Sequence, residues 1–238
     1  MKRVILIMAA VALMVSTGCK KDEKPDVISL KETEKTLYFG EKYQIEATSK
    51  ADIIYKVANE YHAEVSETGL VKARFVGETN ILLSNGEDEK TFRVIVKPES
   101  NLYPEPDLRA GMSKNEVKQK FGVPDNETED GLAYANYSSK VPMLACIFKN
   151  NKLTGYGLMV STVYSSELGT FLAERYVTVD LKKLIFANGL TQETTTMGIQ
   201  AQLYNTSYWM VLYAYVSGNS KSSFSFENQF DDLFKQLQ

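Results

Sequence analysis

Hydrophobic and polar residues alternate with a period of two along residues 27–98, which is the pattern of β-strands that bury one face. The alternation is clearest in four runs, at residues 28–30, 42–48, 81–83 and 92–96. Turn residues separate the runs, and Asn85-Gly86 predicts a hairpin turn between the last two. About seven short strands in about seventy residues, with no helical stretch, predict a small β-sandwich.

This pattern ends at a segment that is rich in proline. Three prolines lie between positions 98 and 106, and proline fixes φ and removes a backbone donor. We therefore expect residues 99–108 to form an extended, semi-rigid linker between a first domain at residues 27–98 and a second domain at residues 109–238.

The second domain opens with a short helix at residues 113–121. Ser113 and Glu116 have the spacing of a capping box, which satisfies backbone donors at the start of a helix. Val117 and Phe121 are four residues apart and therefore share one helical face. A glycine and a proline directly after the helix end it.

Strand and helix patterns then alternate to the end of the chain. Strands are expected at residues 132–137, 143–149, 153–160, 184–187, 197–204 and 208–216, with an Asn150-Asn151 hairpin turn and with helices at 166–176 and 227–237. The last helix would turn Phe230, Leu233, Phe234 and Leu237 inward. The order of elements is αβββ, αβββ, α, which is a repeat of architecture. It predicts an α+β domain with an antiparallel sheet and helices on one face.

The N-terminus carries the signature of a secreted protein. Two basic residues precede an apolar run from Val4 to Val15, which as a helix would rise only about 18 Å and is too short for a membrane span of about 30 Å. Residues 1–18 therefore predict a signal peptide. The small residues before Cys19 resemble a bacterial lipobox, with a departure at Ser16, where Leu or Val is usual. That resemblance implies cleavage before Cys19 and a lipid anchor on its sulfur; the alternative is an ordinary secreted protein.

Residues 19–26 form a charged tether that cannot pack into a core. A lysine followed by acidic residues directly after the lipidated cysteine resembles the surface-export signal of Bacteroidetes lipoproteins. This resemblance implies an outer-membrane lipoprotein whose body lies on the cell surface. The alternative is a lipoprotein that faces the periplasm and has a merely solvated linker.

The first domain resembles a group 2 bacterial immunoglobulin-like domain. The matching segments are residues 37–48, 63–73, 76–83 and 91–98, and the most diagnostic of them is Ala63-Glu-Val-Ser-Glu-Thr-Gly-Leu-Val-Lys-Ala73. The resemblance implies an all-β immunoglobulin-like sandwich that serves as a spacer or adhesion module. The family has no catalytic apparatus, so no active-site residue carries over.

The second domain resembles the BamE/SmpA family and related tandem-repeat proteins shaped like β-lactamase inhibitor protein. The matching motif covers residues 111–125 and consists of Gly111, Met112, Ser113, Val117, Phe121, Gly122, Pro124 and Asp125. The resemblance implies a small envelope protein that acts by protein contact. The motif residues cap and pack the helix, so no binding residue carries over.

Composition and charge exclude several classes of function. Removal of residues 1–18 takes away two basic residues and leaves 25 basic and 30 acidic ones, a net charge of −5. Proteins that bind nucleic acid usually carry a basic surface, so this charge argues against a nucleic-acid partner. The chain has two Cys and one His, which excludes a disulfide scaffold and most metal sites built from His and Cys ligands. His62 is expected at the surface and Cys146 is expected to be buried and inert. No acid–base pair or phosphate loop is recognisable, so we expect no enzyme activity and no cofactor.

The last strand supplies the candidate binding site. Trp209, Tyr213 and Tyr215 share one face of this strand, and Tyr and Trp are good anchors in protein interfaces. We expect that aromatic face to bind a protein partner or ligand. The function expected is thus a non-catalytic, lipid-anchored adhesion or interaction module. The alternatives are a periplasm-facing assembly or scaffold subunit at the outer membrane and, more remotely, an enzyme acting on glycans.

Overall fold

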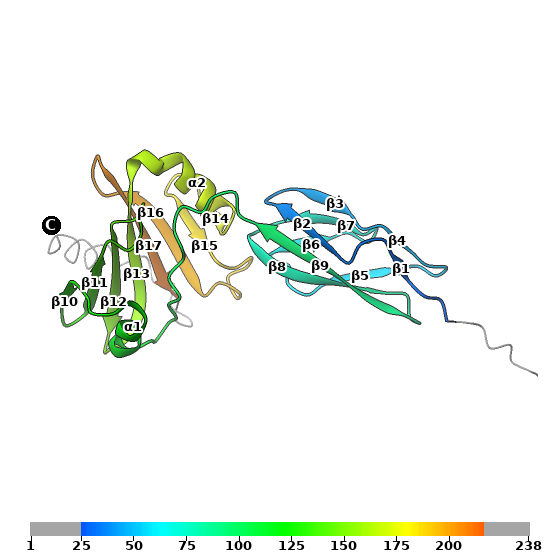
Figure 1. Ribbon diagram of the computed structural model, residues 1–238, viewed down its shortest axis with the longest axis horizontal. Coiled ribbons are helices and arrows are strands. Elements are labelled where there is room, and N and C mark those ends of the chain that lie inside the picture. The colour runs from blue at the N-terminus through cyan, green and yellow to red at the C-terminus, as the bar shows by residue number, and fades with distance from the viewer. Residues whose placement is uncertain (1–24, 217–238) are drawn as a thin grey trace, which may run out of the picture.

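A computed structural model describes residues 25–216. The predicted signal peptide, Cys19, most of the tether and the predicted helix at 227–237 lie outside the described residues. Within them the chain is mostly β, with short helices, and its strands form several sheets (Figure 1). No helix in residues 25–216 is both long enough and apolar enough to cross a bilayer.

Residues 25–98 form two main sheets packed face to face, which we call the N-terminal part. One sheet has the order β2 (Glu34–Tyr38), β9 (Glu89–Lys97), β8 (Gly77–Ser84), β5 (Ile54–Val57), and the other has the order β3 (Lys42–Gln44), β7 (Leu70–Ala73), β6 (Ala63–Val65). A short pair, β1 (Ser29–Leu30) and β4 (Ala47–Thr48), lies beside them. β2 runs parallel to β9, and every other pair here is antiparallel. Side chains from both main sheets fill one apolar core.

The hairpin turn predicted at Asn85-Gly86 is confirmed. Ser84 pairs with Glu89 across the turn, and Gly86 has a φ of 88°. The Asn85 Oδ1 atom accepts hydrogen bonds from the backbone N–H groups of Glu87 and Asp88, at 3.0 and 2.7 Å. The single strand expected at residues 42–48 is instead two strands, because β3 pairs with β7 and β4 pairs with β1.

His62 was expected at the surface, but it is only partly exposed. Its Nδ1 atom lies 3.1 Å from the carbonyl oxygen of Phe75. Its ring also lies over Gly77, which has a φ of 138°. The strand alternation that predicted exposure does not extend to His62, because this residue lies in the turn directly before β6 (Ala63–Val65).

We expect Gly77→Ala to destabilise the N-terminal part by about 1–3 kcal/mol, because the added Cβ atom would clash with the His62 ring, beyond the strain that a positive φ imposes on any residue other than glycine. A Cβ atom at this position would lie 2.2 Å from the His62 Cε1 atom. Urea unfolding of the variant measures the loss. Gly86→Ala is the matched control, since its φ is also positive but its Cβ would meet no atom within 4 Å. Equal losses in the two variants would contradict the steric explanation.

Residues 109–216, the C-terminal part, form one antiparallel sheet of eight strands. Its order is β10 (Asn126–Glu127), β11 (Gly131–Ala135), β12 (Met143–Lys149), β13 (Lys152–Ser161), β17 (Tyr208–Tyr215), β16 (Met197–Leu203), β15 (Ile185–Ala187), β14 (Val177–Asp180). The helices are α1 (Lys114–Phe121) and α2 (Ser165–Ala173), and the 3-10 turn η1 (Thr162–Tyr164) precedes α2.

The sheet consists of two similar halves. Each half is a helix followed by a four-stranded meander, and the last strands of the meanders, β13 and β17, pair at the centre. The expectation of two αβββ units was therefore one strand short in each unit. The strands that were missed are β10, which has two residues, and β14, which follows α2 almost directly.

The local signals in the first half are confirmed. Ser113 caps α1 in a reciprocal capping box with Glu116, and Val117 is fully buried. Asn150 and Asn151 both have positive φ angles, 51° and 58°, as a tight turn between β12 and β13 requires.

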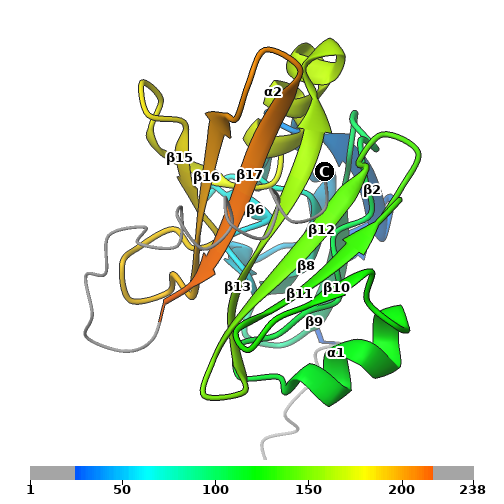
Figure 2. The same ribbon diagram turned by 90° about the vertical axis from the view of Figure 1, so that its left-hand side faces the viewer.

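The two faces of the eight-stranded sheet carry separate apolar clusters. The inner face, which turns toward the N-terminal part, packs against α1 and α2. The outer face turns away from the N-terminal part and carries a smaller cluster of its own (Figure 2).

The proline-rich segment 99–108, which was expected to be an extended, semi-rigid linker, packs against the C-terminal part. Ser100, Leu102 and Tyr103 are 4%, 2% and 4% exposed, and they lie against the C-terminal part. Proline content correctly predicted that residues 99–108 form no strand. It did not predict that the apolar side chains between the prolines would be buried against the C-terminal part.

Candidate functional site

The three residues predicted to bind a partner lie on β17 and belong to the inner face. Tyr213 is fully buried, and its hydroxyl lies 2.8 Å from the hydroxyl of Tyr103. Its ring stacks on that of Tyr156 with centroids 4.5 Å apart. Tyr213 is therefore a core residue, and the expectation that it contacts a partner is wrong.

Trp209 and Tyr215 are half-buried and lie toward the two ends of β17. The Trp209 Nε1 atom donates to the Ser165 Oγ atom at the start of α2, at 2.8 Å. The two residues are six positions apart along the strand, which places their Cα atoms about 20 Å apart. Because the buried Tyr213 lies between them, the three residues do not form one aromatic surface.

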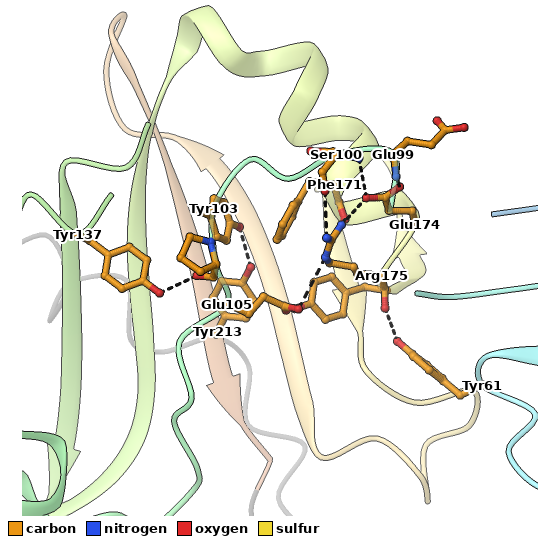
Figure 3. Close-up of polar contacts among 12 residues, drawn as sticks. Tyr61, Glu99, Ser100, Tyr103, Glu105, Tyr137, Phe171, Glu174, Arg175 and Tyr213 are labelled. Carbon is orange, nitrogen blue, oxygen red and sulfur yellow. Dashed lines mark hydrogen bonds and ion pairs between the residues drawn. The ribbon is translucent and has the colours of Figure 1, made fainter. Parts of the chain in front are cut away.

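A polar cluster joins the N-terminal and C-terminal parts where α2 ends (Figure 3). At its centre is Glu174, a carboxylate that is 2% exposed. The Glu174 Oε2 atom accepts from the backbone N–H of Glu99 at 2.7 Å, and its Oε1 atom accepts from that of Ser100 at 3.1 Å. The Glu174 carbonyl accepts from the N–H of Val76 at 2.8 Å.

Arg175 balances this buried charge. One guanidinium nitrogen donates to the Glu174 carboxylate, and another donates to the Ser100 carbonyl at 3.0 Å. Its Nε atom lies 3.7 Å from the Glu105 carboxylate, and its guanidinium lies 3.9 Å from the centre of the Phe171 ring. The charge of Glu174 is therefore paired and hydrogen-bonded, which makes its burial tolerable.

The N-terminal part contributes an aromatic contact to the same cluster. The Tyr61 hydroxyl donates to the Arg175 carbonyl at 2.6 Å, and the Tyr61 ring packs on Phe75 with centroids 4.7 Å apart. Residues from the N-terminal part, the proline-rich segment and the end of α2 thus meet at one place. We call this set the junction: Tyr61, Val76, Glu99, Ser100, Glu105, Glu174 and Arg175.

A group of buried tyrosines lies beside the junction. Burial raises the pKa of Tyr103, Tyr156 and Tyr213, and it also raises that of Tyr176, whose hydroxyl donates to the Glu105 carboxylate. Burial raises the pKa of Tyr137 to about 12. Burial thus disfavours the ionised form of these side chains, and the hydroxyls of Tyr103, Tyr213 and Tyr176 also make hydrogen bonds inside the structure.

Alkaline solution should therefore unfold the C-terminal part cooperatively. In the unfolded chain the tyrosines release protons near the ordinary tyrosine pKa of about 10, whereas the folded ones with raised pKa values do not. Stability is thus complete below about pH 10 and is lost above it, by about 1.4 kcal/mol per pH unit for each such tyrosine. Circular dichroism and tyrosinate absorbance, measured together, should change in one transition. Gradual tyrosinate formation without loss of structure would contradict this expectation.

Exposed apolar side chains gather at the end of the sheet where Trp209 lies. Leu203 pairs with Trp209 across β16 and β17 and is 56% exposed. Val163 in η1 is 80% exposed, and its neighbour Thr162 donates its backbone N–H to the Ser207 carbonyl at 2.8 Å. We call Val163, Leu203 and Trp209 the Trp209 corner. Exposed apolar and aromatic side chains of this kind can anchor a protein interface.

Sequence reasoning did not identify Glu174 and Arg175. One signal was available, because a carboxylate at the C-terminal end of a helix opposes the helix dipole and needs a tertiary reason. Glu174 is the C-cap of α2, and the junction supplies that reason.

Other candidate chemistry in the chain has a structural role. Cys146 is buried, as predicted, and burial raises the pKa of its thiol. Residues 25–216 contain no group of three or more His, Cys, Asp or Glu side chains placed to hold a metal ion.

Comparison with known proteins adds little to these observations. No protein-family model and no curated protein matches the chain. Among solved structures, domains 4–9 of surface layer protein SbsC align with 83% of this chain at 11% identity and a TM-score of 0.29, and the chain covers 28% of that structure. Domains 5–6 of the S-layer protein SbsC align with 82% of this chain at 12% identity and a TM-score of 0.27, and the chain covers 85% of that structure. TM-scores this low do not establish a shared fold.

Proposed function

We propose that this protein is a non-catalytic lipoprotein of the bacterial outer membrane that acts as an arm on the cell surface. Cys19 carries the lipid anchor, the N-terminal part is the spacer, and the C-terminal part contacts a protein partner. The observation that carries the proposal is the junction. Its buried Glu174 bonds to two consecutive backbone N–H groups of the connecting segment.

The junction supports an arm because it restricts rotation between the two parts. A connector that bends freely needs exposed backbone, whereas Ser100 is bound by Glu174 through its N–H and by Arg175 through its carbonyl. Tyr61 and Val76 add contacts from the N-terminal part itself. An arm of fixed shape presents a binding surface without the entropy cost of ordering a hinge.

The finer fold assignment is part of this proposal. The two facing sheets of residues 27–98 and the four matching sequence segments support a group 2 bacterial immunoglobulin-like domain. The reciprocal cap of α1 and the two similar halves of the eight-stranded sheet support a relative of the BamE/SmpA and β-lactamase-inhibitor-protein architectures.

The Trp209 corner is the surface that we assign to the partner. Trp209 retains its predicted role in part, because it is half-exposed and lies beside the exposed side chains of Val163 and Leu203. Tyr213 and the outer face are excluded by their burial.

Cell fractionation tests the anchor. We expect the natural chain to pellet with membranes and Cys19→Ser to appear in the soluble fraction, because removal of the thiol removes the acyl chains whose burial holds the protein. Cys146→Ser is the matched control and should still pellet, since Cys146 is buried in the sheet. Membrane association of Cys19→Ser would contradict a lipid anchor.

Protease treatment of intact cells tests the side of the membrane. Release of the protein body from intact cells supports surface display. Protection until the cells are lysed would instead support the periplasm-facing scaffold subunit, with the same anchor and the same two parts.

A further inference from the structure

The outer face of the eight-stranded sheet carries an apolar cluster that neither described helix covers. Its members lie on the four neighbouring strands β11, β12, β13 and β17 and are Ala133, Met143, Ala145, Ile147, Met159, Met210 and Leu212. Each is only 0–8% exposed. The helices α1 and α2 pack on the opposite face, and Figure 2 shows the outer face turned toward the viewer with α2 behind the sheet.

Such low exposure requires a cover. A sheet face in contact with water leaves every second side chain of each strand accessible, so a cluster that spans four strands cannot bury itself. The cluster belongs to neither the junction nor the Trp209 corner, since both lie on or beside the inner face.

We propose that the C-terminal segment of this same chain, residues 217–238, covers the outer face through an amphipathic helix at residues 227–237. In helical spacing, Phe230, Leu233, Phe234 and Leu237 lie on one side of that segment. The opposite side carries Asn228, Asp232 and Lys235, which suits contact with water.

The dimensions of the segment fit this assignment. Four neighbouring strands span about 14 Å, and a helix of residues 227–237 is about 16 Å long. The segment starts directly after β17, which is one of the four strands that carry the cluster. Residues 217–226 provide up to about 33 Å of extended chain, which is enough to return across the sheet.

The chemistry of the face also favours a helix of this composition. Three of its seven residues are methionines, whose unbranched side chains adapt to the shape of a partner. The two phenylalanines of the helix supply large rings that can pack among them.

Thiol labelling of Met159→Cys, in the chain from residue 19 onward with Cys19→Ser, tests the proposal. Met159 lies on the outer face, and buried Cys146 gives only a slow background, measured in the same chain without Met159→Cys. We expect slow labelling of Met159→Cys and labelling at least about tenfold faster once Phe234→Asp is added. Asn228→Asp is the matched control, because it adds the same charge on the opposite side of the helix, and it should leave the rate unchanged.

Rapid labelling in the chain without Phe234→Asp would show an open face and overturn the proposal. Protection that depends on protein concentration, with twice the monomer mass in light scattering, would identify a second copy of the chain as the cover and would also overturn it. Protection that stays intact after Phe234→Asp is added would overturn it as well.

A second measurement decides the case if Phe234→Asp unfolds the protein. With a short bismaleimide, Met159→Cys paired with Phe234→Cys should cross-link within one chain at least about tenfold faster than Met159→Cys paired with Asn228→Cys, because only the first pair shares an interface. Equal rates for the two pairs would overturn the proposal. This experiment is independent of membrane anchoring, so its failure would leave the proposed function standing.

Discussion

Glu174→Ala should lower the free energy of unfolding of the C-terminal part by about 3–5 kcal/mol, the cost of removing one member of a buried charged pair. The substitution leaves two backbone N–H groups, those of Glu99 and Ser100, without their acceptor, and it leaves Arg175 without the carboxylate beside it. Urea unfolding followed by the fluorescence of Trp209, the single tryptophan of the chain, measures the loss.

The same substitution should also release the connection between the two parts. Small-angle scattering of Glu174→Ala should show a broader distribution of interatomic distances than the natural chain. Glu167→Ala is the matched control on the same helix: its partner is Lys140 and both side chains are about one-third exposed, so the loss should be at most about 1 kcal/mol. Comparable losses in the two variants would show that the junction does not hold the parts together.

Tyr213→Ala should destabilise the C-terminal part by about 3–5 kcal/mol, the usual cost of truncating a buried aromatic residue. Tyr213 is fully buried, stacks on Tyr156 and meets the Tyr103 hydroxyl. Tyr213→Phe should cost about 1–3 kcal/mol, because it leaves the hydroxyl of Tyr103 buried without that partner. Urea unfolding gives both values.

Tyr215→Ala provides the comparison on the same face of the same strand. Tyr215 is only half-buried, so its truncation should cost clearly less than that of Tyr213. A small loss for Tyr213→Ala together with weaker partner binding would instead show that Tyr213 contacts a partner.

Local signals predicted the elements of the fold well where one short stretch of residues decides the outcome. The cap of α1 depends on Ser113 and Glu116 alone, and the turn before β13 depends on Asn150 and Asn151 alone, so both were predictable. The strands that were missed, β10 and β14, have only two and four residues, too few for an alternation to stand out, and each lies at an edge of the sheet, where it pairs only with the next strand of the chain.

The aromatic site was predicted incompletely for a related reason. Alternation along β17 correctly grouped Trp209, Tyr213 and Tyr215 on one face of the strand. It could not tell which layer would cover that face, because α2 and the proline-rich segment reach it only through tertiary packing.

By itself, the sequence determined that the chain is rich in β-strands, that the strand pattern ends at the proline-rich segment, that α1 is capped and where the tight turns lie. Each of these follows from periodicity or from the conformational preference of a few adjacent residues. Only the tertiary structure decided that Tyr213 is core, that the proline-rich segment is packed and that Glu174 holds it. The physical reason is that burial and charge pairing depend on side chains that are close in space but far apart in the chain, as Glu99 and Glu174 are.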